Sequence, residues 1–171
     1  MRSLTHLVLH HSATDATLGV GDPEGAALWA AIRRNHQRHW ARTVPGYVCD
    51  YHVAVGPTGV VFTGQPLAMV AFNCGNARLN AVSIAVCFLG NFQVAGMPAL
   101  QYAAGVQLLR SLSGQHGIAV SHVILHREVP SERTGIPGFT ACPGRWFPSA
   151  AMRTALEDHG GGGSSRAAMA R

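Results

Sequence analysis

The sequence predicts a single α/β domain whose mixed central β-sheet is flanked by helices on both faces. Apolar, strand-like runs alternate along the chain with segments that carry apolar residues at helical spacing. One run, residues 81–92, is almost entirely apolar in its middle, which is typical of a central strand covered on both faces. Two other runs flank the turn GPTG at 56–59, which predicts an antiparallel hairpin and therefore a mixed sheet. The chain has 171 residues, 47% of them apolar, which is enough for one sizeable core.

The first half of the chain is expected to contain one strand, one helix and the hairpin. Residues 4–11 are predicted to form the first strand, and the stretch 15–24, rich in Asp and Gly, is predicted to be a loop. Residues 25–40 carry apolar side chains at helical spacing and predict a helix. The two strands of the hairpin are expected at 48–55 and 60–64.

The second half adds two helices and one strand. The segment 97–117 opens with a proline in its first turn and closes on a glycine, as a helix does. The β-branched segment 118–125 predicts a strand, and 145–160 predicts a final helix that glycine stops. The remaining residues have the composition of a linker. We therefore expect a folded domain over 1–159 and a flexible Gly/Ser-rich tail over 160–171.

Charge and hydropathy exclude several classes of protein. The net charge of +5 comes from arginine alone, because all 13 basic residues are arginines. These are spread along the chain apart from one group that fits a solvated helix face: Arg33, Arg34, Arg38 and Arg42. We therefore expect no nucleic-acid partner. No apolar run approaches the roughly 20 residues of a membrane span, and the N-terminus lacks a signal-peptide core, so we expect cytoplasmic synthesis without membrane insertion.

Histidines and one cysteine at predicted strand ends are candidates for a metal site. Zinc is bound by His nitrogen and Cys sulfur, and a catalytic site has three protein ligands with the fourth position left for water. The candidates are the pair His10 and His11, the pair His122 and His126, and Cys142. On a strand, positions four apart are separated by roughly 13 Å, so the second pair supplies only one ligand. Four other histidines are assigned to solvated or structural positions: His36, His39, His116 and His159.

Four motifs, taken together, resemble the zinc-dependent N-acetylmuramoyl-L-alanine amidases of type 2. They are LVLHHSAT, DYHVAVGPTG, NAVSIAVCFLGNF, and HREV followed by TACPG. Each motif alone is a weak signal, but the four occur in the order of the family between Leu4 and Trp146. The resemblance implies the fold that these enzymes share with peptidoglycan-recognition proteins and amidase-type phage lysozymes.

The resemblance also implies roles for five residues. His10, His126 and Cys142 fall on the positions of the three zinc ligands. Tyr51 falls where the family has a catalytic tyrosine beside the metal. Thr140 falls where members carry a lysine or threonine that contacts the reacting carbonyl.

Two departures from the family pattern concern the surroundings of this site. The loop 127–141 is longer than usual, and we expect it to lie beside the metal and to shape substrate access. Asn73 stands where relatives often carry a histidine. His11 and His52 are expected to support the zinc ligands or to pack beside them, because a ligand imidazole usually has its other nitrogen held by a neighbour.

The sequence offers no strong candidate for a carboxylate general base. Three of the eight acidic residues fall near the motifs: Asp50, Glu128 and Glu132. Asp50 alternates with Tyr51 on a predicted strand and is expected to point away from the site. Glu128 is expected to hold the local backbone or an arginine.

The implied function is zinc-dependent hydrolysis of the amide bond between N-acetylmuramic acid and L-alanine in bacterial peptidoglycan. Synthesis without a signal peptide suits a bacteriolytic phage or prophage endolysin, a monomer that reaches the wall after release. A non-catalytic peptidoglycan-binding module of the same fold is one alternative, disfavoured by the presence of Cys142. A zinc peptidase that cleaves the stem peptide is another.

Overall fold

The fold is built on one five-stranded sheet. The computed structural model describes residues 2–14 and 23–160, with side chains to residue 158. The strand order is β3-β2-β4-β1-β5. The strands are β1 (His6–His11), β2 (Val53–Val55), β3 (Val61–Thr63), β4 (Ser83–Phe88) and β5 (Val123–Leu125). Only β2 and β3 pair antiparallel, whereas β1 pairs parallel with β4 and β5, and β2 with β4. The prediction of a mixed sheet is therefore confirmed.

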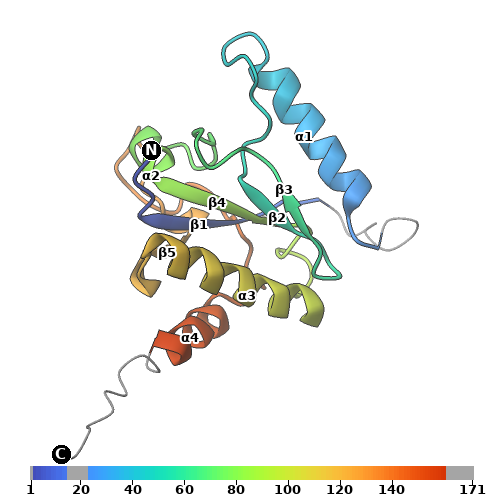
Figure 1. Ribbon diagram of the computed structural model, residues 1–171, viewed down its shortest axis with the longest axis vertical. Coiled ribbons are helices and arrows are strands. Elements are labelled where there is room, and N and C mark those ends of the chain that lie inside the picture. Colours follow the sequence, from blue (N-terminus) through green and yellow to red (C-terminus); the bar gives the residue numbers. More distant parts are fainter. Residues whose placement is uncertain (1, 15–22, 161–171) are drawn as a thin grey trace, which may run out of the picture.

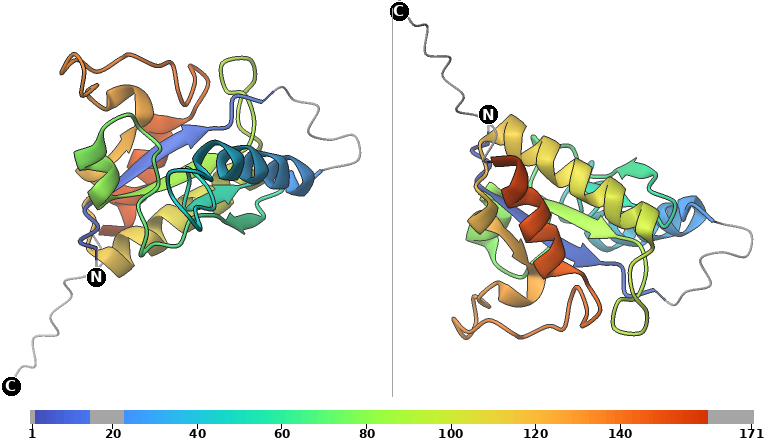
Figure 2. Two further views of the ribbon diagram at one scale, coloured as in Figure 1. Left: turned by 90° about the horizontal axis from the view of Figure 1, so that it is seen from above. Right: turned by 90° about the horizontal axis from the view of Figure 1, so that it is seen from below.

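Helices cover both faces of this sheet (Figures 1 and 2). They are α1 (Ala26–Trp40), α2 (Ala77–Val82), α3 (Ala99–His116) and α4 (Ser149–Gly160), with 3-10 turns η1 (Val120–His122) and η2 (His126–Glu128). The helices α3 and α4 lie side by side on one face, and α1 lies on the other (Figure 2). None of the helices in the described segments is both long and apolar enough to cross a membrane.

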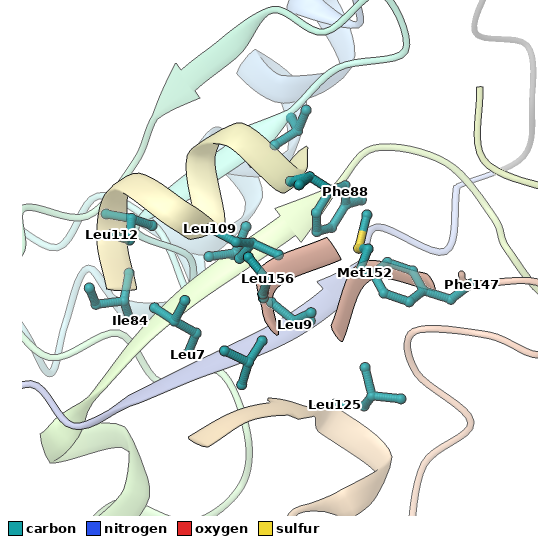
Figure 3. Close-up of a cluster of buried hydrophobic side chains, with 14 of the residues drawn as sticks. Leu7, Leu9, Ile84, Phe88, Leu109, Leu112, Leu125, Phe147, Met152 and Leu156 are labelled. Atoms are coloured by element: carbon teal, nitrogen blue, oxygen red, sulfur yellow. The ribbon is translucent and has the colours of Figure 1, made fainter. Parts of the chain in front are cut away.

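The main hydrophobic core lies between the sheet and the pair α3 and α4 (Figure 3). Because strand side chains alternate, Leu7 and Leu9 of β1 point into this layer together with Phe88 of β4. The helix α3 approaches β4 closely at Gly105, where an added Cβ atom would lie 2.4 Å from the Phe88 ring. The six residues of β4 are all buried, as expected for a central strand.

The opposite face of the sheet is covered by α1 and α2. Trp29 of α1 packs against Ala54 and Cys87, and its Nε1 donates a hydrogen bond to the Thr63 carbonyl at 3.1 Å. Leu79 of α2 packs against the small cluster around Val8. This face is the one on which the functional site is built.

Several predicted boundaries are wrong, each for a local reason. The helix α2 was not expected; the Asn76 side chain begins it by accepting a hydrogen bond from the Leu79 N–H. The strand predicted over 118–125 shrinks to β5, because the His122 N–H bonds to the Ala119 carbonyl in a 3-10 turn and not to a neighbouring strand. The last helix begins at Ser149, after Pro148.

Two predicted helices are confirmed, and two predicted segments lie partly or wholly outside the described residues. The helices expected over 25–40 and 97–117 are confirmed within two residues at each end. Of the loop predicted over 15–24, residues 15–22 lie outside the described residues, as does the tail from 161 onwards.

The sheet topology gathers the candidate residues at one edge. Parallel strands present their carboxyl ends at the same edge of a sheet. The strands β1, β4 and β5 are neighbours with this orientation, so His10, His11 and His126 all emerge there.

Candidate functional site

The two adjacent histidines at the end of β1 face opposite sides of the sheet. His10 is only 1% exposed and points to the same side as Val8, as strand alternation requires. His11 points toward the other layer, where its Nδ1 accepts a hydrogen bond from the Phe92 N–H at 3.1 Å. Only His10 therefore turns its ring toward His126.

His10, His126 and Cys142 come together although 132 positions separate the first from the last. The rings of His10 and His126 lie 4.6 Å apart between centroids, and the Cys142 Sγ lies 3.8 Å from the His10 Nδ1. One nitrogen from each histidine and the sulfur all lie within 4.8 Å of one another. Within the described part of the chain, this is the one cluster of His, Cys, Asp or Glu that could hold a metal ion.

The donor set fits a tetrahedral zinc ion. With Zn–N of about 2.1 Å and Zn–S of about 2.3 Å, tetrahedral ligand atoms are about 3.4–3.6 Å apart, close to the His10–Cys142 separation. The buried Nε2 of His126 has no hydrogen-bond partner among the described residues. A buried nitrogen without a partner is costly, and a metal ion would satisfy it.

The protonation states suit the histidines for ligation. Burial lowers the pKa of His126 to about 4, and burial also holds the pKa of His10 well below its ordinary value. Both imidazoles are therefore neutral at physiological pH, which is the form that binds metal. Burial raises the pKa of the Cys142 thiol to about 11, so the sulfur must lose a proton when it binds a metal.

The loop that carries Cys142 is fixed by backbone hydrogen bonds. The Arg127 N–H donates to the Cys142 carbonyl at 2.9 Å, which ties the loop to η2. The His11 N–H donates to the Cys142 Sγ at 3.4 Å, so this neighbour supports the site through its backbone. Gly144 has φ +102 and no room for a side chain, since a Cβ would lie 2.4 Å from the Phe92 carbonyl carbon.

A pocket of about 450 Å³ opens beside the three candidate ligands. Tyr51, Thr140, His126 and Cys142 all line it. The Tyr51 ring centroid lies 5.2 Å from that of His10, and burial raises the pKa of Tyr51 well above its ordinary value, which keeps the hydroxyl protonated. Thr140 Oγ1 accepts a hydrogen bond from the Cys142 N–H at 3.2 Å. The structure thus brings all five predicted site residues to one place.

The acidic residues near the motifs have structural partners. Asp50 does not line the pocket, which agrees with the prediction that it points away, although residues 50 and 51 precede β2 and are not part of a strand. It accepts hydrogen bonds at 2.8 Å from the Trp40 Nε1 and the Tyr47 hydroxyl. Glu128 accepts a hydrogen bond from the Leu125 N–H and pairs with Arg153 of α4, so it holds both backbone and an arginine. Glu132 accepts a hydrogen bond from the Ala77 N–H. Among the described residues, no carboxylate lines the pocket.

His52 and His122 lie away from the site. The His52 Nδ1 accepts a hydrogen bond from the Ala85 N–H of β4 at 2.9 Å, and its Nε2 faces the Met69 carbonyl at 3.1 Å, so the ring lies beside β4. The His122 ring stacks on His6 at the other end of β5, so the prediction of one ligand from the His122–His126 pair agrees with the geometry.

Asn73 has a role in the site that the sequence did not identify. Its Oδ1 lies 3.0 Å from the His10 Nε2, so Asn73, and neither His11 nor His52, holds the second nitrogen of His10. The sequence points to Asn73 only through the family resemblance, which implies a histidine at this position.

The long loop 127–141 flanks the site. Its Gly138 N–H donates to the Arg127 carbonyl, which folds the loop back toward η2. The Phe139 ring then stands edge-on to His126 at 5.4 Å, while 48% of its surface stays exposed. The loop therefore lies beside the candidate metal ligands, as its position in the sequence predicts.

Comparison with solved structures identifies the fold. The N-acetylmuramoyl-L-alanine amidase LysC from Clostridium intestinale URNW has a TM-score of 0.69 at 19% identity, over 91% of this chain and 87% of that chain. The Ph2119 endolysin from Thermus scotoductus MAT2119 bacteriophage Ph2119 has a TM-score of 0.64 at 22% identity, over 91% of this chain and 86% of that chain. The complex of peptidoglycan recognition proteins LCa and LCx with tracheal cytotoxin has a TM-score of 0.62 at 20% identity, over 86% of this chain and 80% of that chain.

Comparison of sequences identifies the family. No curated protein sequence matches the chain. The family described as N-acetylmuramoyl-L-alanine amidase, however, matches residues 1–145, which include all five candidate site residues. The chain therefore belongs to the N-acetylmuramoyl-L-alanine amidase family and has its fold.

Proposed function

We propose that this protein is a zinc hydrolase that cleaves the amide bond between N-acetylmuramic acid and L-alanine in peptidoglycan. The observation that carries the proposal is the meeting of one nitrogen each from His10 and His126 with the Cys142 sulfur, all within 4.8 Å, at the wall of an open pocket. Membership of the amidase family supports the choice of substrate.

In this proposal, His10, His126 and Cys142 hold zinc, and Tyr51 and Thr140 act on the substrate. Bound zinc supplies Lewis acidity, which polarises a carbonyl and activates water. The Tyr51 hydroxyl, kept protonated by burial, donates a hydrogen bond to the oxygen that becomes negative when the amide is attacked. Such a donor acts most strongly where charge develops in the transition state.

Thr140 is arranged to serve as a second donor. Its oxygen already accepts the Cys142 N–H, so its own proton is left to donate toward the pocket that the residue lines. No described carboxylate is available there as a general base, so we assign that role to no side chain.

The biological setting that fits best is a phage or prophage endolysin. The net charge of +5 would favour adsorption to an anionic bacterial wall. We propose that residues 1–159 form the catalytic domain of a monomer that acts on the wall after release from the cytoplasm. The structural likeness to a bacteriophage endolysin supports this setting.

A binding module without catalysis is the second candidate. It is favoured by the likeness to recognition proteins solved with tracheal cytotoxin bound. The complete set of candidate metal ligands, Cys142 included, argues for hydrolysis instead.

Digestion of purified peptidoglycan by the zinc-loaded full chain separates these functions. We expect mass spectrometry to find intact glycan strands with free muramic acid lactyl carboxyl groups, and stem peptides with new L-alanine amino termini. Release of D-amino acids would instead identify a peptidase. Binding to the wall with no released product would identify a recognition module.

Tyr51→Phe is expected to retain zinc but to lower kcat about 100-fold, because it removes one donor to the developing oxyanion. Tyr102→Phe is the matched control, since within the described segments the Tyr102 hydroxyl donates only to the Ala151 carbonyl, on the helical face away from the pocket. Turnover should be measured together with zinc content. Unchanged turnover in Tyr51→Phe would make Tyr51 a packing residue.

A further inference from the structure

The two ring nitrogens of His10 face different partners. Its Nδ1 lies 3.8 Å from the Cys142 Sγ, on the side of the candidate metal. Its Nε2 lies 3.0 Å from the Asn73 Oδ1, on the side of the protein interior. A neutral imidazole carries a proton on only one of these nitrogens, so its tautomer decides whether the Nδ1 can bind a metal.

The contacts of Asn73 determine that tautomer. Its Nδ2 donates a hydrogen bond to the Ala71 carbonyl at 2.9 Å. A carbonyl can only accept, so the amide must turn its NH₂ group toward Ala71 and its oxygen toward His10. The Asn73 oxygen can also only accept, which requires the proton of His10 to be on Nε2. The Nδ1 lone pair is then free on the side of Cys142.

We propose that Asn73 is a positioning residue that fixes the tautomer and ring orientation of His10 for metal binding. This inference rests on the metal site of the proposed function. Partners that hold the second nitrogen of a metal-binding histidine typically change metal affinity by about 10- to 100-fold when they are removed. Asn73 acts through His10 and needs no contact with substrate.

Asn73 is itself held rigidly, as a positioning residue has to be. It is only 8% exposed. The Asn80 Oδ1 accepts hydrogen bonds from the N–H groups of both Asn73 and Cys74, at 3.3 and 3.2 Å. The Tyr47 hydroxyl accepts the Phe72 N–H at 2.8 Å, and the two rings stack at 5.2 Å. The backbone on both sides of Asn73 is therefore anchored, which limits the freedom of its amide.

Two substitutions separate positioning from a merely structural role. In Asn73→Leu the acceptor for His10 is lost, and we expect the dissociation constant of Zn²⁺, measured by chelator competition on the full chain, to rise about 10- to 100-fold. In Asn73→Asp the acceptor is kept, but the donor to the Ala71 carbonyl is lost. We expect this variant to lose thermal stability and yet to bind Zn²⁺ within about threefold of the wild type.

Gln101→Leu is the matched control for loss of a buried amide. The Gln101 Nε2 donates to the carbonyls of Val55 and Leu89, on the far side of the sheet from Asn73. We expect this variant to lose stability without any change in Zn²⁺ affinity. If Zn²⁺ affinity instead follows thermal stability across all three variants, Asn73 is only structural and the proposal is wrong.

The tautomer can be observed directly by NMR from the ring ¹⁵N shifts of His10, in the full chain with and without Zn²⁺. We expect protonated Nε2 in the wild type and in Asn73→Asp, and a mixture of tautomers in metal-free Asn73→Leu. A proton on Nδ1 in the metal-free wild type would overturn the inference. Cys142→Ala that bound Zn²⁺ with wild-type affinity would overturn the proposed metal site itself, which distinguishes the two failures.

Discussion

Cys142→Ala is expected to abolish both zinc binding and peptidoglycan hydrolysis. The variant removes the only sulfur among the three candidate ligands and leaves two imidazoles. If one ligand contributes on the order of a third of the roughly 10–16 kcal/mol typical of zinc sites, its loss costs about 4 kcal/mol, or about 1000-fold in the dissociation constant. If a metal buffer holds free zinc about 30-fold above the wild-type dissociation constant, the wild type stays loaded, the variant is largely empty, and its hydrolysis stops.

The measurement is zinc content by elemental analysis together with wall lysis. Cys49→Ala is the matched control, because Cys49 is also a free cysteine but is buried in the cluster under α1. This control should lose some stability from the cavity it creates while keeping zinc and activity. Full activity in Cys142→Ala would contradict the ligand assignment.

The fold could be predicted where burial leaves a long pattern in the sequence. The apolar middle of 81–92 indicated the central strand because β4 is covered on both faces. The helix α2 could not be predicted in this way, because its six residues are too few for a helical period and its start depends on the Asn76 cap. The strand β5 is only three residues long, too short to show an alternating pattern, and the 3-10 turn that ends at His122 sets where it begins.

The candidate ligands could be predicted as residue types at strand ends, but their selection needed the family resemblance. Alternation along β1 shows why only one of two adjacent histidines can serve: His10 and His11 point to opposite faces. The role of Asn73 was beyond local reasoning. It contacts His10 across 63 positions, through a loop whose course is set by hydrogen bonds that its backbone N–H groups donate to Asn80 and Tyr47.

Zinc affinity is expected to rise about tenfold for each unit of pH between about pH 5 and pH 7. In the metal-free protein, burial raises the pKa of the Cys142 thiol to about 11 and lowers that of His126 to about 4. At pH 6 the imidazoles are therefore neutral and the thiol is protonated. Binding then releases one proton, from sulfur, so higher pH favours binding.

Calorimetry at pH 6 in two buffers of different ionisation enthalpy measures the number of protons released for each zinc ion bound. One proton released for each zinc bound is the expected result. A value of zero would mean that zinc binds without the Cys142 thiolate. A value of two would mean that one of the ligand histidines is protonated before binding, which would contradict their burial. Cys49→Ala should release one proton, like the wild type, because its thiol is not a ligand.

Zinc affinity should depend more steeply on pH below about pH 4, because His126 then also has to lose a proton before it can bind zinc. Folding itself responds in the same direction, because burial lowers the pKa of His52 to about 4 from the ordinary value of 6.5. Its contribution to stability is present above pH 6.5 and is lost as the pH falls toward 4, by at most about 1.4 kcal/mol per unit. His10 and His126, whose pKa values burial also lowers, add to this loss of stability in the metal-free protein. Activity, zinc content and circular dichroism should therefore be measured together between pH 5 and 7, where we expect activity to follow zinc content. Activity that falls with zinc while the circular dichroism stays native would show that metal release, and not unfolding, limits hydrolysis.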